Sequence, residues 1–511
     1  MDAYGYIFVE DTENIYYILI GLYLVGMIVV GIVHALRIRT ALEYLAAGRD
    51  VGFWGTMGTV VATVCGAAAF IGFVGQGYSS GISGFFLWVL PAIFFGLIFA
   101  LCFGRRLREL GIFTLSDAFS LRYGKTAGLF PALIQIFVLA APMLGAQILG
   151  LGVVFHTFFG LSLTICIYLG FIIIVVYTFF GGLPTCILTD IIQAVVLSFA
   201  LILFFFLSLK HGREGFNLFT STPQAFWKPF GQGGFLSFLA SSITIGMSFL
   251  IWQSLWQRNY IAQSNGIAIW GVLIGLVFSC ILLSLSFLIG ISALGFLEPG
   301  LRPMEVFTVS IKTIFPPTLG AMIIVGLVSA IMSGADSFIM MATASISRDI
   351  YQRYFRPDAS NRQILFFSRL GVVGFSCLGL IIAFAAQGII PLLMLSFKTT
   401  GASLVIPFLA LMFWKNSTRS GVIWGMVAGL LTTMVLYFYS GQSIWPSAWG
   451  YACSLAVTIA VSILTAHADD EQVKALYFQM LDTEVNLNFG TIASRDNLYR
   501  QQTIETGKLK E

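Results

Sequence analysis

The sequence predicts an all-α polytopic membrane protein, and two properties of the chain support this. Only 10% of its 511 residues are charged and its mean hydropathy is +0.92, whereas roughly a quarter of the residues of a soluble domain are charged. The apolar residues also form long continuous runs, and about 20 of them cross a hydrocarbon core of about 30 Å as a helix. A transmembrane β-barrel would show short alternating segments, so the pattern excludes a barrel.

A window of membrane length predicts about thirteen transmembrane helices. In chain order they are Ile15–Ala35, Gly52–Phe73, Gly84–Phe103, Leu129–Val154, Leu161–Phe180, Ile187–Leu209, Phe235–Leu255, Ile267–Ala293, Thr318–Ser345, Ile364–Ala386, Ile389–Phe413, Val422–Tyr439 and Trp445–Thr465. Two sizeable pieces lie outside them, the loop from Lys210 to Gly234 and the tail from Ala466 to Glu511. We expect the tail to form a short amphipathic helix followed by disorder.

The basic residues predict how the chain is oriented in the bilayer. Most of the 27 Lys and Arg residues fall on one side of the predicted spans, among them Arg105, Arg122, Arg258, Arg348 and Arg353. Because cytoplasmic loops are enriched in Lys and Arg, the N-terminus is predicted outside and the C-terminus inside. Anchoring at the lipid surface accounts for these basic clusters, so the lipid bilayer is the expected partner and nucleic acid is not.

Among the charged residues within the predicted spans, Asp190, Asp336 and Lys398 are the functional candidates, because charge is costly there. Asp190 lies near the start of its helix, where a charge can reach the membrane interface, whereas Asp336 and Lys398 lie deep in theirs. Asp336 is accompanied by Ser333 and Ser337 on the same helix. Hydroxyl groups beside a carboxylate suit a hard cation, although a helix-packing seam of small residues would give the same pattern.

Two spans contain glycine-bearing segments that predict breaks near the bilayer midplane, Cys65–Gly72 (CGAAAFIG) and Gly246–Ser248 (GMS). They occupy corresponding positions in the two halves of the chain. Transporters with inverted repeats unwind the first helix of each repeat, and the freed carbonyl groups bind the ion. The pattern therefore favours a five-plus-five inverted-repeat core.

The predicted organisation follows from this repeat. Its parts are an outer N-terminus with a leading helix and first cytoplasmic loop (1–51), the first repeat (52–209), an outer loop (210–234), the second repeat (235–413), two trailing helices (414–465) and a cytoplasmic tail (466–511).

Several motifs resemble those of the sodium:solute symporter family. The stretch Tyr177–Leu183 (YTFFGGL), with Thr189, Asp190 and Gln193, is similar to that family's YTxxGGLxxxxxTDxxQ pattern. Ser329–Ser337 (SAIMSGADS), followed by Asp349-Ile350-Tyr351, resembles its SAxMSTxDS and DIY signature. Further matches are Gln257-Arg258, Ala62-Thr63 with Gly66 and Phe70-Ile71-Gly72, and Phe113-Thr114-Leu115 with Arg122-Tyr123-Gly124. The resemblance runs from about Glu43 to Gly425 in the family order.

The resemblance implies the leucine-transporter-like fold and alternating access driven by an inward sodium gradient. It implies a cation-coupled symporter, not an enzyme, with no catalytic residue and no cofactor beyond Na⁺ as the coupling ion and only metal. We therefore expect a multi-pass protein of the cell (inner) membrane of a bacterium. The alternatives are a proton-coupled symporter of the same fold, a membrane sensor module, and a channel-like or structural membrane protein. The tail after Ala466 is too short to hold the signalling kinase that a sensor would need.

The central sodium site of the family, carried over residue by residue, falls on Ala62, Cys65, Ala330, Ser333 and position 334. The family has Ser or Thr at position 334, and this chain has Gly. This difference leaves three alternatives: a water molecule replaces the missing oxygen ligand, the site binds Na⁺ weakly, or protons drive transport. Some family members have a further sodium site, which implies a second cation or proton site at Asp190, Asp336 and Ser337.

The substrate of such a transporter is expected between the two broken helices. The candidate residues are Ala67, Ala69 and Phe70 from the first, Ser248, Phe249 and Trp252 from the second, and Gln147 and Lys398 from the helices that close the site. The run Ala67–Ala69 lacks the polar side chains of sugar-binding relatives, which argues against a sugar. Lys398 argues for an anionic solute such as a carboxylate.

Overall fold

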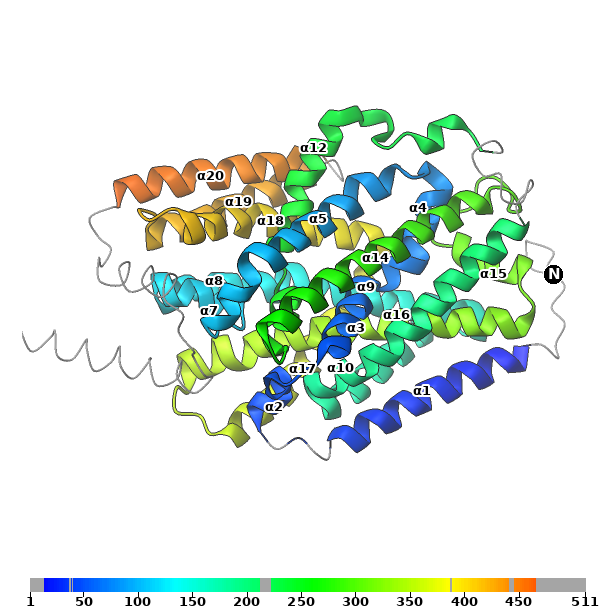
Figure 1. Ribbon diagram of the computed structural model, residues 1–511, viewed down its shortest axis with the longest axis horizontal. Helices are drawn as coiled ribbons and strands as arrows, with labels where there is room; N and C mark the ends of the chain where they lie inside the picture. The colour runs from blue at the N-terminus through cyan, green and yellow to red at the C-terminus, as the bar shows by residue number, and fades with distance from the viewer. Residues whose placement is uncertain are drawn as a thin grey trace, which may run out of the picture.

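The computed structural model describes residues 13–35, 38, 40–211, 222–386, 388–440 and 445–465. These residues form a bundle in which most helices run roughly along the long axis of the molecule (Figure 1). The predicted cytoplasmic tail lies outside the described residues.

The helices have the following bounds in chain order: α1 (Glu13–Ala35), α2 (Ala41–Ala46), α3 (Phe53–Val64), α4 (Phe73–Ser80), α5 (Leu90–Ile98), α6 (Arg105–Glu109), α7 (Leu115–Tyr123), α8 (Lys125–Ile134), α9 (Ala141–Phe159), α10 (Leu163–His211), α12 (Gly234–Thr244), α13 (Gln253–Ile261), α14 (Asn265–Ala293), α15 (Val306–Ile314), α16 (Pro317–Ala344), α17 (Asn361–Ala385), α18 (Ile389–Phe413), α19 (Arg419–Ser440) and α20 (Trp445–Leu464). Short 3-10 or π-helical segments complete the chain: η2 (Ala47–Arg49), η3 (Ala68–Gly72), η4 (Phe85–Val89), η5 (Phe99–Gly104), η6 (Gln135–Ala140), η7 (Gln224–Trp227), η8 (Gly231–Gly233), η9 (Gly246–Leu250) and η10 (Ser345–Phe355).

The outer surface of the bundle is apolar, as a surface in contact with lipid must be. Leu22 on α1, Val195 on α10 and Phe438 on α19 are 65%, 67% and 85% exposed. In a soluble protein, such extensive exposure of large apolar side chains would promote aggregation. The chain is therefore a multi-pass membrane protein, as the sequence predicts.

Eleven of the described helical segments are long and apolar enough to cross a membrane, and the broken pair α3 and η3–α4 makes a twelfth. The remaining predicted span, Leu161–Phe180, corresponds to the shorter apolar stretch Leu163–Val176 of α10. The all-α polytopic architecture is confirmed, while the count of about thirteen spans remains a prediction.

Both predicted helix breaks are present. The first lies between α3 and η3, where the helix axis bends by 50°. The second lies between α12 and α13, where η9 is followed by Trp252 in an extended conformation (ψ 104°). The start of the first broken helix lies beside the end of the second. Val51 N, just before α3, donates a hydrogen bond to Ile261 O at the end of α13 (3.2 Å). This antiparallel arrangement is the one that an inverted repeat requires.

Helix α10 joins two predicted spans through a kink at Gly182. Gly182 has φ 55°, which strongly favours glycine, and a Cβ atom there would lie 2.5 Å from Cδ2 of Tyr44. Pro184 follows and cannot donate a helical hydrogen bond. The Gly-Gly-Leu-Pro sequence therefore bends the helix where the sequence predicts a short turn.

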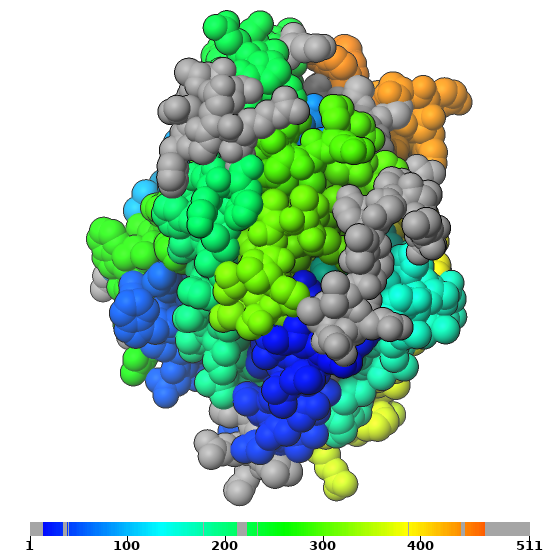
Figure 2. Space-filling model, turned by 90° about the vertical axis from the view of Figure 1, so that its right-hand side faces the viewer, coloured from blue at the N-terminus to red at the C-terminus, as the bar shows by residue number. Residues whose placement is uncertain are grey.

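The two ends of the described chain lie at opposite ends of the bundle, where α1 begins and where α20 ends (Figure 1). Figure 2 looks onto the end from which α1 starts, and the light green segment around α15 lies near its centre. Termini on opposite sides are expected for an odd number of crossings. Which end faces the cytoplasm stays a prediction.

One of the basic residues that the sequence assigns to the lipid surface, Arg122, is instead buried. It is 2% exposed, and its guanidinium donates to Ala410 O (3.0 Å) and Trp414 O (2.7 Å) at the end of α18. Carbonyl groups in the last turn of a helix have few helical donors left beyond them, so they can accept from a buried guanidinium. Arg122 therefore caps α18, and the prediction of a lipid anchor is wrong for this residue.

The same correction applies to Arg348 and Arg353 on η10. Arg353 donates to Asp117 Oδ1 at 2.6 Å, and Arg348 NH1 lies 3.2 Å from Asp117 Oδ2. Burial opposes ionisation of Asp117, but the two guanidinium groups and a hydrogen bond from the Thr114 backbone lower its pKa below its ordinary value. These ion pairs form because buried guanidinium groups need a counter-charge. They hold α7 against η10, the segment that follows α16.

Candidate functional site

The first helix break exposes backbone carbonyl groups beside α16. Helix α3 ends at Val64, because Cys65 has ψ 56° and leaves the helical region. Ser333 Oγ lies 2.9 Å from Ala62 O and 3.1 Å from Ala330 O. Ala62, Cys65, Ala330 and Ser333 are each fully buried. We call Ala62, Ala330 and Ser333 the carbonyl cluster.

The structure thus brings together three of the four residues predicted from the sequence to bind sodium. The fourth, Cys65, lies in the unwound segment three residues beyond Ala62, and its thiol contacts Ser279 of α14. The carbonyl cluster offers neutral oxygen atoms from two different helices, which is the donor set that a hard cation takes.

A second group of polar side chains lies one turn further along α16. Thr63 Oγ1 and Ser337 Oγ are 2.8 Å apart, and Ser337 Oγ donates to Asp336 Oδ1 at 3.4 Å. From α3, the Thr59 hydroxyl donates to a carboxylate oxygen of Asp190 on α10. All of these side chains are buried. With Arg258, described next, they form what we call the charged cluster: Thr59, Thr63, Asp190, Arg258, Asp336 and Ser337.

Arg258 neutralises part of this cluster and is fully buried. Its NH2 group donates to Ser337 Oγ (2.5 Å) and Thr63 Oγ1 (3.0 Å) and lies 3.8 Å from Asp190 Oδ2. The sequence-based placement of Arg258 in a cytoplasmic loop is therefore wrong. Helix α13 continues to Ile261 and carries Arg258 into the bundle, where carboxylates balance its charge.

The leading helix α1 contributes a residue that the sequence analysis missed. Tyr23 OH accepts a hydrogen bond from Ser329 Oγ on α16 (2.8 Å) and another from Gln193 Nε2 on α10 (3.1 Å). A tyrosine among many aromatic residues of a lipid-facing helix gives no signal of this contact. Tyr23 therefore joins α1 to α10 and α16, the two helices that carry Asp190 and Asp336.

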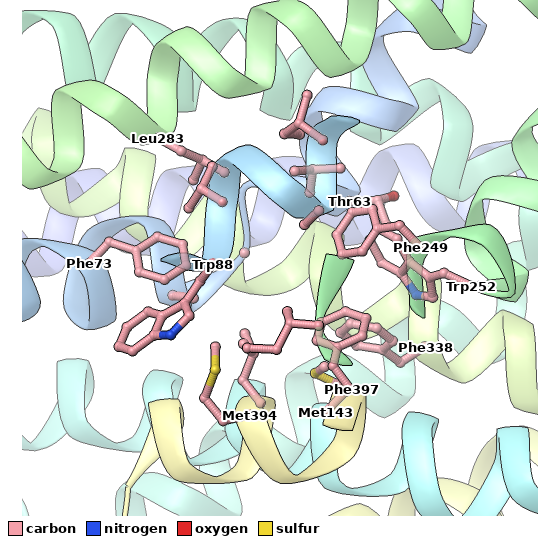
Figure 3. Close-up of a pocket in the computed structure, with 18 of the residues that line it drawn as sticks. Thr63, Phe73, Trp88, Met143, Phe249, Trp252, Leu283, Phe338, Met394 and Phe397 are labelled. Carbon is pink, nitrogen blue, oxygen red and sulfur yellow. The ribbon is translucent and has the colours of Figure 1, made fainter. Parts of the chain in front are cut away.

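A cavity lies between the two broken helices, α9 and α18 (Figure 3). Phe73 and Trp88 stand on one side of it, and Phe249, Trp252 and Phe338 stand on the other (Figure 3). Its walls also include Thr63, Val64, Gly66, Ala68, Val89, Ala92, Ile93, Met143, Gln147, Ile245, Leu283, Leu393, Met394 and Phe397. Aromatic walls with few polar groups are typical of a site for a small organic molecule.

The cavity contains only part of the predicted substrate site. Gln147, Phe249 and Trp252 line it. The other candidates, Ala67, Ala69, Phe70, Ser248 and Lys398, are buried but are not among the lining residues. Phe73, Trp88, Phe338 and Phe397 line it and were not predicted, because aromatic side chains also cover the lipid-facing surface of such a bundle.

Lys398 follows a cavity-lining residue but does not line the cavity itself. Phe397 is part of the wall, and successive side chains on a helix point about 100° apart. Lys398 is 9% exposed. Among the residues that the structure describes, those lining the cavity include none with a charged side chain.

Comparisons with known proteins agree with this geometry. A family model for the sodium:solute symporter family matches residues 44–429. A sodium/proline symporter of Haemophilus influenzae is 24% identical over 449 residues, which cover 80% of this chain and 86% of that protein.

Two solved structures share the fold. A Na⁺-coupled sialic acid symporter, in a substrate-bound outward-open state, superposes with a TM-score of 0.77 at 19% identity, over 88% of this chain and 98% of that one. A nucleobase-cation-symport-1 family transporter in a closed conformation gives a TM-score of 0.55 at 14% identity, over 86% of this chain and 98% of that one. The leucine-transporter-like fold expected from the sequence is confirmed.

Proposed function

The chain belongs to the sodium:solute symporter family and imports a small organic solute together with Na⁺, and from this premise we propose how it binds both. Na⁺ binds at the carbonyl cluster, with Cys65 contributing its carbonyl group, and the solute binds in the adjoining aromatic cavity. Access to the two sites alternates between the two sides of the membrane. The two inverted repeats are residues 52–209 and 235–413, and their helices interlace, with α3 and α4 packed on α14 and α10 packed on α16.

The observation that carries this proposal is the position of the Ser333 hydroxyl between two carbonyl oxygens, Ala62 O on α3 and Ala330 O on α16. The single hydroxyl hydrogen of Ser333 can point at either acceptor. When Na⁺ enters, the hydroxyl rotates so that its oxygen, with the two carbonyl oxygens, faces the ion. The ion therefore holds α3 against α16, and this is how its binding favours one conformation over the other.

The cavity supports a solute without net charge. Trp88, Phe249 and Trp252 offer flat apolar surfaces, while Gln147 and Thr63 offer polar groups. A solute with an apolar body and a polar end fits these walls. An anionic solute, suggested by Lys398, is the competing proposal. It requires the Lys398 ammonium group to attract the solute although Lys398 does not line the cavity.

A specific observation keeps proton coupling as the second candidate. Oδ1 of Asp190 is buried and, within the described part of the chain, makes no hydrogen bond. A carboxylate oxygen in that position can take up a proton or meet a second cation. Arg258 holds Ser337 and Thr63 in this conformation, so a second cation at the predicted site of Asp190, Asp336 and Ser337 would need Arg258 to move.

We also propose that the protein resides in the inner membrane of a bacterium, since the sodium/proline symporter that it resembles is bacterial. The orientation with the N-terminus outside follows from the distribution of basic residues. Removing Arg258, Arg122 and Arg348, which are buried, and Arg353, which is partly buried, still leaves most of the remaining basic residues on the same side.

The first experiment measures solute uptake into proteoliposomes under a Na⁺ gradient, a proton gradient, both and neither. Proline and sialic acid, named for the relatives, are the first labelled solutes to test, followed by a neutral amino-acid panel. Na⁺-driven uptake should persist when the proton gradient is collapsed. Uptake that follows only the proton gradient would instead support Asp190 as the coupling residue.

The second experiment changes the carbonyl cluster. Ser333→Ala removes one oxygen ligand and should raise the Na⁺ concentration needed for half-maximal uptake by about tenfold, which corresponds to about 1.4 kcal/mol of binding free energy. Ser286→Ala is the matched control, because that buried hydroxyl donates to Leu282 O of its own helix. Equal Na⁺ dependence in the two variants would place the ion elsewhere.

A further inference from the structure

One polar side chain from α9 lies against two glycines beside the carbonyl cluster. A Cβ atom on Gly334 would lie 3.1 Å from Cδ and 3.3 Å from Oε1 of Gln147. A Cβ atom on Gly66 would lie 3.0 Å from Nε2 of Gln147. These separations are tighter than ordinary packing, so the carboxamide group occupies the space that a side chain at either position would need.

The carboxamide of Gln147 is held in place by the broken helix. Gln147 is 4% exposed, and its Oε1 accepts a hydrogen bond from Ala67 N at 3.0 Å. Ala67 begins the second half of the broken helix, where backbone N–H groups lack helical partners. An amide oxygen has two lone pairs, so one remains for a second donor or for a cation.

Gln147 also contacts the solute cavity, since it is one of the lining residues together with Gly66. The same carboxamide therefore touches the unwound segment of the first broken helix, α16 beside Ser333, and the space for the solute. Burying an amide against glycines is costly unless its polar atoms are used. An apolar side chain would fill this volume without the free-energy cost of burying a polar group.

We propose that Gln147 supplies the oxygen ligand that Gly334 cannot, and that it links ion binding to solute binding because its carboxamide borders both sites. The inference rests on the proposed Na⁺ site at the carbonyl cluster. Gly334 is then an adaptation to Gln147, and the site is complete. Na⁺ at the second lone pair of Oε1 fixes the carboxamide in the orientation that it presents to the solute, so each ligand favours the binding of the other.

The test measures Na⁺ affinity without solute, by the Na⁺-dependent rise in melting temperature of the purified protein, with choline chloride balancing ionic strength. Gln147→Leu, which keeps the size of the side chain but removes the oxygen, should weaken Na⁺ binding by about tenfold. Gln147→Glu, which keeps an oxygen at this position, should bind Na⁺ at least as tightly as the native protein. Native Na⁺ affinity in Gln147→Leu would overturn the inference and leave Gln147 as a solute-binding residue.

The reciprocal pair at position 334 gives the sharper result. Gly334→Ser alone should weaken Na⁺ binding, because its Cβ meets the carboxamide. Combining it with Gln147→Ala should restore the affinity to within about threefold of native, because the new hydroxyl then has both the space and the ligand position. A Gly334→Ser variant that binds Na⁺ more tightly on its own would contradict the inference, since it would mean that the site lacks a ligand.

Two comparisons separate this inference from the proposed function. If Ser333→Ala weakens Na⁺ binding and Gln147→Leu does not, only the inference fails. If neither variant changes Na⁺ binding, the carbonyl cluster is not the ion site and both fail. Should Gln147→Leu not purify as folded protein, the comparison of Gly334→Ser with the double variant decides alone.

Discussion

Two polar clusters lie one turn apart along α16, and they are built in opposite ways. The carbonyl cluster holds Ser333 between two backbone oxygens and contains no charged side chain. The charged cluster around Ser337 contains two carboxylates, Asp190 and Asp336, and the guanidinium of Arg258. The carbonyl cluster offers oxygen atoms that can coordinate an ion, whereas in the charged cluster the hydroxyl groups of Thr63 and Ser337 already accept hydrogen bonds from Arg258.

The difference indicates how a buried site can prefer a cation without holding one permanently. With both carboxylates ionised, the charged cluster carries one net negative charge. Two unit charges about 8 Å apart interact by about 2 kcal/mol at an effective dielectric constant of about 20. At the proposed Na⁺ site in the neighbouring carbonyl cluster, an attraction of this size would favour the ion and still let it leave.

The largest expected effect comes from breaking the charged cluster. Arg258→Met should destabilise the protein by about 3–5 kcal/mol, because it leaves two carboxylates buried without their counter-charge. The fall in melting temperature in detergent measures this. Arg302→Met is the control, since the Arg302 side chain is 81% exposed and pairs with Glu305 one turn away. Equal melting temperatures in the two variants would contradict a structural role for Arg258.

A smaller effect sharpens the comparison between the clusters. Ser337→Ala removes one acceptor of Arg258 and should cost about 1–2 kcal/mol of stability, the usual penalty for a charged group that loses a hydrogen bond. Ser333→Ala should cost less, because its partners are neutral carbonyl groups. Thermal unfolding of both variants without Na⁺ checks this order, and the reverse order would mean that the hydroxyl of Ser333 is the structural one.

The smallest effect is expected at Lys398. Because Phe397 and not Lys398 lines the cavity, Lys398→Gln should leave the KM for the solute within about threefold of native while the protein stays Na⁺-responsive. Phe397→Ala, which removes part of the wall, is the positive control and should raise the KM more. Loss of solute binding in Lys398→Gln would establish the anionic solute that the sequence suggests.

Local sequence predicted the features that depend on one helix alone. The long apolar runs predicted the membrane spans. Gly66 and its small neighbours predicted the first helix break, because an unwound helix needs small residues. Ala330 and Ser333 could be placed on the ion site because the motif around them resembles the family signature. The sequence could not show that the Gly334 position is filled by Gln147, since those residues are far apart in the chain.

Features that depend on which face of a helix meets which neighbour were not predictable. Arg258 was counted as a surface charge, although two acidic residues in predicted spans already called for a buried counter-ion. In a membrane bundle both the lipid-facing and the inward-facing sides are apolar, so periodicity does not separate them. Trp88 and Phe338 therefore gave no sign that they line the cavity, and Tyr23 gave none that it reaches α16.

Equilibrium binding of radioactive sodium to the purified native, Ser333→Ala and Ser337→Ala proteins, without solute, tests the central claim most directly. If Na⁺ binds the carbonyl cluster, binding should be saturable in the native protein and in Ser337→Ala and should weaken by about tenfold in Ser333→Ala. Native affinity in Ser333→Ala together with lost binding in Ser337→Ala would contradict the account, because it would place the ion in the charged cluster.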